Sequence, residues 1–117
     1  MGLNHVSITV ADRARSAAFY REHFGLEEEV FATAKGLVLG AADGATLAFE
    51  EGEVPPELPR GNHFGFQLDG PEAVRAARER LRAAGVTETE FADKGDFARV
   101  QVLDPDGYRV ELIGRAT

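Results

Sequence analysis

The stretch that decides the fold is LNHVSITV, residues 3–10, which recurs in modified form as GNHFGFQL at residues 61–68. Apolar and polar residues alternate along both stretches, and this period of two predicts a β-strand in each. Successive side chains of a strand point to opposite faces, so His5 and His63 lie on the face opposite the apolar side chains. The recurrence predicts a duplicated unit that opens with a strand carrying an Asn-His pair.

A helix and three further strands are expected after each of these opening strands. The first helix covers residues 13 to about 24, with Asp12 as its N-cap and Gly25 as its C-cap. The second begins at Pro71, which suits a first helical position, and ends before Gly85. An Asp-Gly turn precedes the last strand of each half. The strands expected after the helices cover about residues 27–32, 36–40 and 46–50, and then 87–91, 98–103 and 109–113.

The buried stripe of each expected helix follows from the spacing of its apolar residues. In the first helix these are Ala14, Ala17, Ala18 and Phe24. In the second helix they are Val74, Ala77, Leu81 and Ala84. Each helix is expected to share an apolar seam with its opening strand, which leaves the other face of the sheet to line a cavity.

The length of 117 residues fits a single compact domain. Its proline-rich stretch at about residues 54–60 is unsuited to regular structure and is the natural linker. We therefore predict an α+β domain of two βαβββ modules, at about residues 1–53 and 61–117.

Composition and charge exclude several classes of function. The chain has no cysteine, so disulfides, thiolate metal sites and cysteine nucleophiles are excluded, and any metal must be held by nitrogen and oxygen. The net charge of −7 argues against nucleic acid as a partner. No signal peptide and no apolar stretch of membrane-spanning length is found, so we expect a cytoplasmic protein that does not bind membranes.

Three residues opposite the apolar stripes are candidate metal ligands. His5 and His63 hold equivalent positions in the two repeats, and Glu111 lies in the last expected strand, where Val110 and Leu112 take the other face. Two imidazoles and one carboxylate suit a divalent first-row metal with open positions for water or substrate. Each residue taken alone also fits a solvent-facing strand position, and at this point both interpretations stand.

A fourth ligand depends on how the two halves are aligned. Matching the Asp-Gly turns pairs Glu111 with Ala48, whereas a shift of two residues pairs it with Glu50. Ala48 and Glu50 share a strand face because they are two residues apart. Glu50 is therefore either a second carboxylate of the site or a surface residue of the acidic run at residues 50–53.

The sequence resembles the vicinal oxygen chelate superfamily, which includes glyoxalases, fosfomycin-resistance transferases, extradiol dioxygenases and bleomycin-resistance proteins. The resemblance covers the whole chain. The first histidine, second histidine and glutamate of the family fall on His5, His63 and Glu111. The resemblance is carried by NHVSITV at residues 4–10, SAAFY to FGL at 16–26, NHFGF at 62–66 and LDPDGYRVE at 103–111.

This resemblance implies one divalent metal ion, either zinc, nickel, manganese or iron, that chelates two neighbouring oxygens of a small-molecule substrate. Glu111 is then a proton-transfer group as well as a ligand, and Glu50 is a second candidate catalytic carboxylate. The family fold is a curved mixed sheet around a cleft with helices on its outer face, usually in a homodimer. The expected function is that of a glyoxalase-like metal-dependent lyase or isomerase acting on a small oxygenated molecule.

Three alternatives to this function stay open. A metal-free protein of the bleomycin-resistance type sequesters a cationic drug, which suits the negative charge and the eight phenylalanines but not the intact ligand set. A fosfomycin-resistance-type transferase needs only three ligands and a cationic pocket, to which Arg99 and Lys94 would contribute. An extradiol dioxygenase uses the same ligand set, in most cases in a longer chain.

Four polar residues on the faces opposite the apolar stripes are candidate substrate contacts. Each also fits an ordinary polar position on a strand. They are Ser7, Gln67, Arg99 and Gln101.

Overall fold

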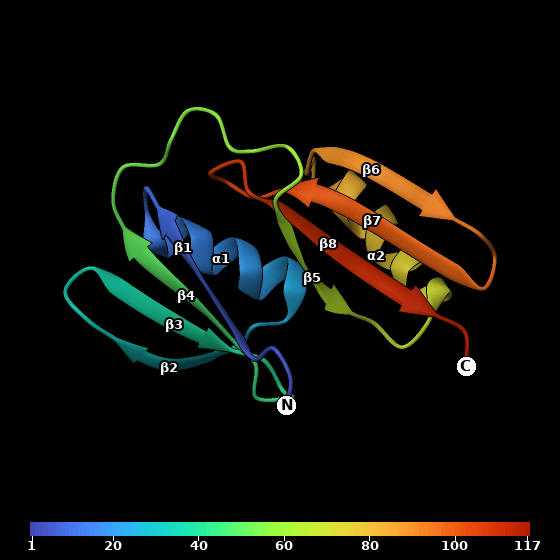
Figure 1. The fold of residues 1–117 in the computed structure, drawn as a ribbon, viewed down its shortest axis with the longest axis horizontal. Coiled ribbons are helices and arrows are strands. Elements are labelled where there is room, and N and C mark those ends of the chain that lie inside the picture. The colour runs from blue at the N-terminus through green and yellow to red at the C-terminus, as the bar shows by residue number, and fades with distance from the viewer. The chain divides into compact units, whose positions relative to one another are not determined.

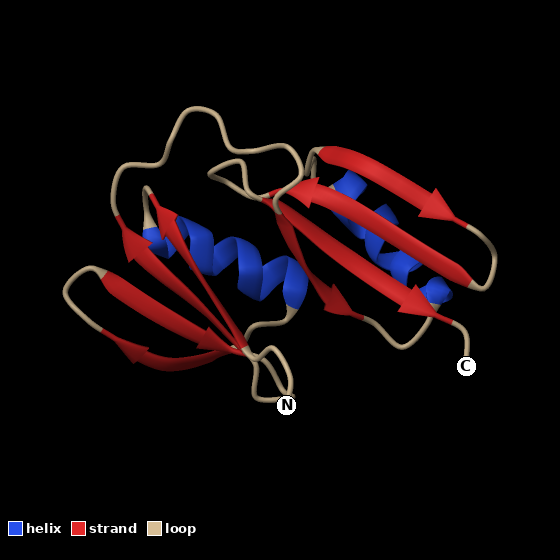
Figure 2. Ribbon diagram, viewed as in Figure 1, coloured by secondary structure: helices blue, strands red, loops and turns tan.

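The computed structural model describes all 117 residues and divides them into two compact units, Met1–Pro56 and Glu57–Thr117. We call these units module 1 and module 2. The boundary between them falls inside the proline-rich stretch expected to be a linker. Each module consists of one four-stranded mixed sheet and one helix in the order βαβββ (Figures 1 and 2). The predicted α+β fold of two similar βαβββ modules is confirmed.

In module 1 the strand order is β1-β4-β3-β2, and the first and last strands of the module run parallel. Strand β3 is antiparallel to both of its neighbours. A parallel pair cannot be joined by a tight turn, so the intervening helix and hairpin supply the crossover between β1 and β4. The elements are β1 (His5–Val10), α1 (Arg13–Phe24), β2 (Glu28–Ala32), β3 (Gly36–Gly40) and β4 (Thr46–Glu51).

Module 2 repeats this topology with the strand order β5-β8-β7-β6. Its parallel pair is β5 and β8, and β7 is antiparallel to both β8 and β6. Neither α1 nor α2 is long and apolar enough to cross a membrane. The elements are β5 (His63–Gln67), α2 (Pro71–Ala83), β6 (Glu88–Asp93), β7 (Phe97–Leu103) and β8 (Arg109–Arg115).

The helix of each module packs on the apolar face of its own sheet. In module 1, Tyr20 of α1 is fully buried, and its ring lies 5.5 Å from that of Phe49 on β4. The buried stripe of α1 is Ser16, Ala17 and Tyr20, so the prediction that Ala14 and Ala18 are buried is wrong. In module 2 the predicted stripe of Val74, Ala77 and Leu81 is buried, whereas Ala84 is exposed because α2 ends at Ala83.

A β-bulge interrupts the outer hairpin of each module. In module 2 the ladder shifts between Glu88, which pairs with Val102, and Glu90, which pairs with Gln101. In module 1 the ladder between β2 and β3 shifts between Glu29 and Phe31. A bulge adds one unpaired residue, so residues on its two sides that would share a strand face are turned to opposite faces.

The turn before β8 is held by one buried carboxylate. Asp104 is 5% exposed, and its Oδ1 accepts hydrogen bonds of 2.9 Å from the backbone N–H groups of Asp106 and Tyr108. The backbone N–H of Asp104 donates in turn to the carbonyl of Tyr108. These bonds fix the entry of the chain into β8, the strand that carries Glu111.

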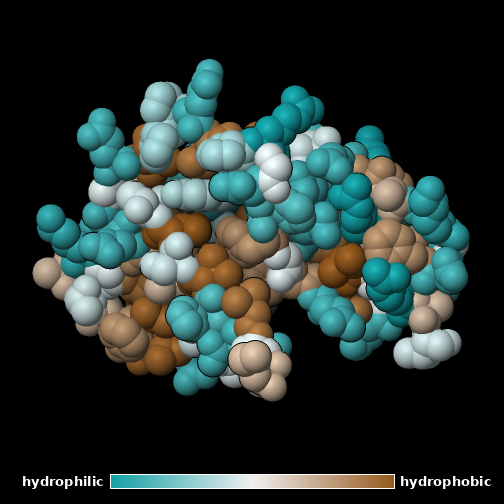
Figure 3. Space-filling model, viewed as in Figure 1, coloured by the Kyte–Doolittle hydropathy of each residue, from teal (hydrophilic) through white to brown (hydrophobic).

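The faces away from the helices differ in polarity between the modules. In the view of Figure 3, apolar side chains gather over the strands of module 1 and polar side chains predominate over the sheet of module 2. Two apolar residues of β2, Val30 and Phe31, are 47% and 57% exposed. The predicted ligand pair of module 2 therefore lies on a polar sheet face.

Candidate metal centre

His63 and Glu111 face each other from neighbouring parallel strands of module 2. In the pairing of β5 with β8, His63 lies opposite Arg109 and Gly65 lies opposite Glu111. Residues two apart share a face, so His63 and Glu111 are diagonal neighbours on the face away from α2. Nε2 of His63 is 3.9 Å from Oε1 of Glu111, and the two side chains are 43% and 11% exposed. This pair supplies two of the three predicted metal ligands.

Hydrogen bonds at Nδ1 orient both candidate histidines. Nδ1 of His63 lies 3.1 Å from the carbonyl oxygen of Gly61, and Nδ1 of His5 lies 2.7 Å from Oδ1 of Asn4. These oxygens accept hydrogen bonds, so the tautomer of each imidazole with its proton on Nδ1 fits them and leaves Nε2 available to a metal. Metal-binding histidines are commonly held in this way through their second nitrogen. The chemistry of the donor set therefore fits a divalent metal.

Gly65 makes room for Glu111. A Cβ at Gly65 would lie 2.9 Å from the backbone oxygen of Glu111 and 3.1 Å from its Cβ. The corresponding pair in module 1 is Ser7 opposite Ala48. Module 2 thus combines the smallest residue with a glutamate, and module 1 combines two small residues.

The sheet register also aligns the two halves. His5 lies opposite Thr46 as His63 lies opposite Arg109, so Ala48 is the counterpart of Glu111. Glu50 lies opposite Thr9, one pair further along the same face. Of the two alignments that the sequence left open, the ladder follows the one that matches the Asp-Gly turns. A role for Glu50 as ligand or proton-transfer group stays a prediction.

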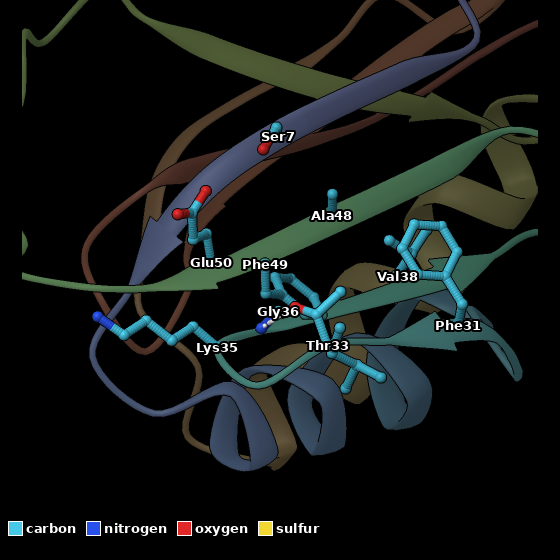
Figure 4. Close-up of a pocket in the computed structure, with 10 residues that line it drawn as sticks. Ser7, Phe31, Thr33, Lys35, Gly36, Val38, Ala48, Phe49 and Glu50 are labelled. Atoms are coloured by element: carbon cyan, nitrogen blue, oxygen red, sulfur yellow. Dashed lines mark hydrogen bonds between the residues drawn. The ribbon is translucent and has the colours of Figure 1, made fainter.

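Glu50 lines a pocket of about 260 Å³ in module 1 (Figure 4). Ser7 of β1 and Ala48 of β4 lie on the same wall, and Lys35 lies at the turn before β3. Phe31 and Val38 contribute apolar surface from β2 and β3. His5 is two residues from Ser7 and so faces the same side of β1. Polar and apolar side chains thus both line this pocket, and Glu50 and Lys35 are its charged groups.

Arg99 of β7 joins two carboxylates on the open face of module 2. Its Nη1 is 3.2 Å from Oε1 of Glu111, and its Nη2 is 3.0 Å from Oε1 of Glu90. The hydrogen bond that Arg99 donates to Glu90, and then the negative charge of Glu111, raise the pKa of Arg99 above its usual value. Sequence reasoning named Arg99 as a substrate contact and missed Glu90. No sequence signal marks Glu90, because the bulge beside it cannot be seen in the alternation of residues.

The four predicted substrate contacts have different surroundings. Gln101 is only 2% exposed, and its Oε1 accepts a hydrogen bond of 3.0 Å from the hydroxyl of Thr89. Gln67 and Ser7 lie on the faces away from the helices, opposite Ile113 and Ala48 respectively. Substrate binding by these residues stays a prediction.

The predicted three-residue ligand set also stays a prediction. It takes His5 from module 1 and His63 and Glu111 from module 2. Neither module by itself brings together three or more histidine, aspartate or glutamate side chains able to hold a metal.

Comparison with known proteins defines the class. The family model of the Glyoxalase/Bleomycin resistance protein/Dioxygenase superfamily matches residues 2–112, and the chain belongs to this superfamily. It is 32% identical over 113 residues to glutathione transferase FosA of Serratia marcescens, covering 94% of this chain and 78% of that protein. It is 30% identical over 114 residues to a probable trivalent organoarsenical cleaving enzyme of Bacillus subtilis (strain 168), covering 92% and 76% of the two chains.

Solved structures support the same assignment. The fosfomycin resistance protein FosX of Listeria monocytogenes, in complex with Mn(II) and a sulfate ion, matches with a TM-score of 0.81 and 28% identity, covering 99% of this chain and 90% of that chain. A possible glyoxalase from Bacillus cereus also has a TM-score of 0.81, with 26% identity and coverage of 97% and 98%.

Proposed function

We propose that the protein is a metal-dependent enzyme of the glyoxalase type that acts as a lyase or isomerase on a small oxygenated molecule. In this proposal His5, His63 and Glu111 hold one divalent metal ion, which is zinc, nickel, manganese or iron. The observation that carries it is the pair of His63 and Glu111, 3.9 Å apart on neighbouring strands, with Nδ1 of His63 within hydrogen-bond distance of the carbonyl of Gly61. The similarity to a possible glyoxalase from Bacillus cereus and to the FosX structure that contains Mn(II) supports it.

When bound, the metal supplies a Lewis acid that stabilises negative charge on two neighbouring substrate oxygens. The residues of the chain then have separate tasks. Glu111, with a largely buried carboxylate, is a metal ligand and a proton acceptor close to the substrate. Arg99 provides a guanidinium beside this carboxylate that binds an anionic group of the substrate.

The role of Glu50 decides between an isomerase with a second carboxylate in its site and an enzyme that needs only the three metal ligands. A proton moved between two carbon atoms requires a base on each side of the substrate or one base that reaches both positions. If Glu50 is the second catalytic carboxylate, Glu50→Gln lowers kcat by at least tenfold and leaves the affinity for metal within a few-fold. If it is the fourth ligand, the same change weakens metal binding as well.

A second candidate function is a fosfomycin-resistance-type transferase that uses three ligands. The register favours it, because the counterpart of Glu111 in module 1 is Ala48, which has no donor atom. The guanidinium of Arg99 next to Glu111 would suit a phosphonate. The similarity to FosA also favours the transferase. The metal is common to both candidates, so substrate trials must separate them.

Metal analysis of the purified protein tests the proposal. Protein prepared without chelators is expected to contain about one divalent metal ion per chain, and His63→Ala and His5→Ala are each expected to abolish its binding. His23→Gln is the matched control, because His23 is the third histidine and lies on α1. Circular dichroism establishes that each variant is folded. Absence of metal, with no binding of zinc, nickel, manganese or iron on titration, would contradict the enzyme and favour a metal-free drug-binding protein.

Substrate trials then follow on the metal-loaded protein. A panel of the glutathione adduct of methylglyoxal, fosfomycin with glutathione, and catechol covers the isomerase, transferase and dioxygenase alternatives. We also expect a homodimer in the cytoplasm, and sedimentation velocity tests the oligomeric state.

A further inference from the structure

Glu90, Arg99 and Glu111 form a chain of charges on the face of module 2 that carries His63. Arg99 donates from Nη1 to Oε1 of Glu111 at 3.2 Å and from Nη2 to Oε1 of Glu90 at 3.0 Å. The side chain of Glu111 is 11% exposed, whereas that of Glu90 is 50% exposed. The guanidinium therefore connects a buried carboxylate of the candidate metal centre to a solvent-facing carboxylate outside it.

The same oxygen of Glu111 faces two different partners. Oε1 is 3.2 Å from Nη1 of Arg99 and 3.9 Å from Nε2 of His63. A divalent cation held by His63 and Glu111 would carry the same sign of charge as the guanidinium next to it. Like charges at such short range repel, most strongly where solvent is scarce. The contact of Arg99 with Glu111 and the binding of a metal are therefore in competition.

Glu90 gives the guanidinium a second partner that does not depend on Glu111. Its hydrogen bond from Arg99, at 3.0 Å, is shorter than the bond of 3.2 Å from Arg99 to Glu111. Glu90 reaches this face only because of the bulge in the β6–β7 ladder, which places it opposite Gln101. Arg99 can therefore lose its hydrogen bond to Glu111 and still keep the one to Glu90.

We propose that Arg99 is the counter-cation of Glu111 in the metal-free protein, and that metal binding transfers it to Glu90 and frees one edge of its guanidinium for an anionic substrate group. This inference rests on the proposed metal-dependent function. It makes Arg99 a positioning residue for the metal ligand before metal binds and a specificity residue afterwards. It also implies that metal binds before the substrate anion, because the anion binds tightly only after the metal has displaced Arg99 from Glu111. Substrates with a carboxylate, phosphonate or similar oxyanion beside the chelating oxygens are the class that this arrangement selects.

Titration with Mn²⁺ alone tests the competition without any substrate. Arg99→Gln is expected to tighten Mn²⁺ binding by about tenfold, because it removes a positive charge beside the carboxylate oxygen that would bind the metal. Arg99→Lys keeps the positive charge but loses the planar guanidinium that bonds both carboxylates. Its Mn²⁺ affinity is expected to fall between those of the wild type and Arg99→Gln. Arg80→Gln on the exposed side of α2 removes one positive charge elsewhere and is expected to leave the affinity within twofold.

Glu90→Gln is expected to change the affinity for Mn²⁺ in the opposite direction. Without Glu90, Arg99 turns fully to Glu111, so Mn²⁺ binding is expected to weaken several-fold. This effect is expected to vanish in the double variant with Arg99→Gln, because Glu90 acts through Arg99. Glu79→Gln, another exposed residue of α2, controls for the lost negative charge.

Methylphosphonate serves as the anion in the second part of the test. Its affinity for the Mn²⁺-loaded protein is expected to fall at least tenfold in Arg99→Gln and to stay unchanged in Arg80→Gln. Binding by the metal-free wild type is expected to be weaker than by the loaded protein.

The outcomes separate this inference from the proposed function. If the wild type binds Mn²⁺ and Arg99→Gln has the affinity of Arg80→Gln or a weaker one, the competition is refuted and the metal enzyme stands. If the wild type binds no divalent metal, both are refuted. Thermal unfolding establishes that each variant is folded. If Arg99→Gln does not fold, the values for Arg99→Lys and Glu90→Gln decide, and equal affinity of both to the wild type refutes the inference.

Discussion

Gly65→Ala tests the close contact between β5 and β8 on which the position of Glu111 depends. The added Cβ would lie 2.9 Å from the backbone oxygen of Glu111 and 3.1 Å from its Cβ. Both distances are inside ordinary van der Waals contact. A backbone oxygen within a strand pair can move only if the strands separate. The substitution is therefore expected to strain the β5–β8 ladder and to displace Glu111.

The magnitude follows from two opposing contributions. Overpacking of this kind costs about 1–3 kcal/mol. Replacing glycine by alanine also restricts the unfolded chain, which stabilises the fold by about 0.4–1 kcal/mol where the native backbone permits it. Gly61→Ala isolates the second contribution, because nothing lies within 4 Å of a Cβ at Gly61. The two variants are thus expected to differ by about 1–3 kcal/mol in free energy of unfolding.

Urea unfolding followed by far-ultraviolet circular dichroism measures this difference, since the chain has no tryptophan to serve as a fluorescent probe. Metal titration of the two variants gives a second readout, and Gly65→Ala is expected to bind Mn²⁺ more weakly than Gly61→Ala. Equal unfolding free energies within about 0.5 kcal/mol would refute the argument that Gly65 is required for the approach of Glu111.

Three further predictions concern the frame of module 2. Gly114→Ala is expected to be more destabilising than Gly65→Ala, because its Cβ would lie 2.6 Å from the backbone carbon of Gly70, and a midpoint of thermal unfolding equal to that of the wild type would contradict this. Asp104→Ala removes the acceptor of two backbone hydrogen bonds, with an expected loss of about 1–3 kcal/mol in urea unfolding. The Arg75 guanidinium holds the pKa of Asp93 well below its usual range, so this pair adds stability above the pKa of the unfolded aspartate, about 3.9, and loses it as the pH falls further. Asp93→Asn should therefore flatten the acid side of the curve of unfolding temperature against pH, and an unchanged curve would contradict the pairing.

Most of the frame could be predicted because it depends on local periodicity. The alternation of residues in the opening strands and the caps of α1 identified both modules, and α1 has the expected bounds of residues 13–24. The buried stripe of α1 was misplaced because alanines carry little information about which face is buried. The actual stripe includes Ser16, a polar residue that is fully buried.

The neighbours of the candidate site were harder to predict because they depend on the register between strands. Period two places Glu88 and Glu90 on one face of β6. The bulge between them turns Glu88 toward Arg78 of α2, at 2.6 Å, and Glu90 toward Arg99 on the other face. Because of one unpaired residue, Glu88 thus forms an ion pair with the helix, whereas Glu90 lies beside the candidate metal centre.

The matching bulge in module 1 has a consequence for solubility. Strand β2 ends its sheet, and it carries Val30 and Phe31 in exposed positions. A straight edge strand with exposed apolar side chains offers a template on which a second chain can add a strand, which is a common start of aggregation. The shift in the ladder between Glu29 and Phe31 breaks the regular row of backbone donors and acceptors along this edge. The β-bulge that turns Glu88 and Glu90 to opposite faces in module 2 has a counterpart in module 1. There it makes the exposed apolar edge of β2 a poorer template for a strand of a second chain.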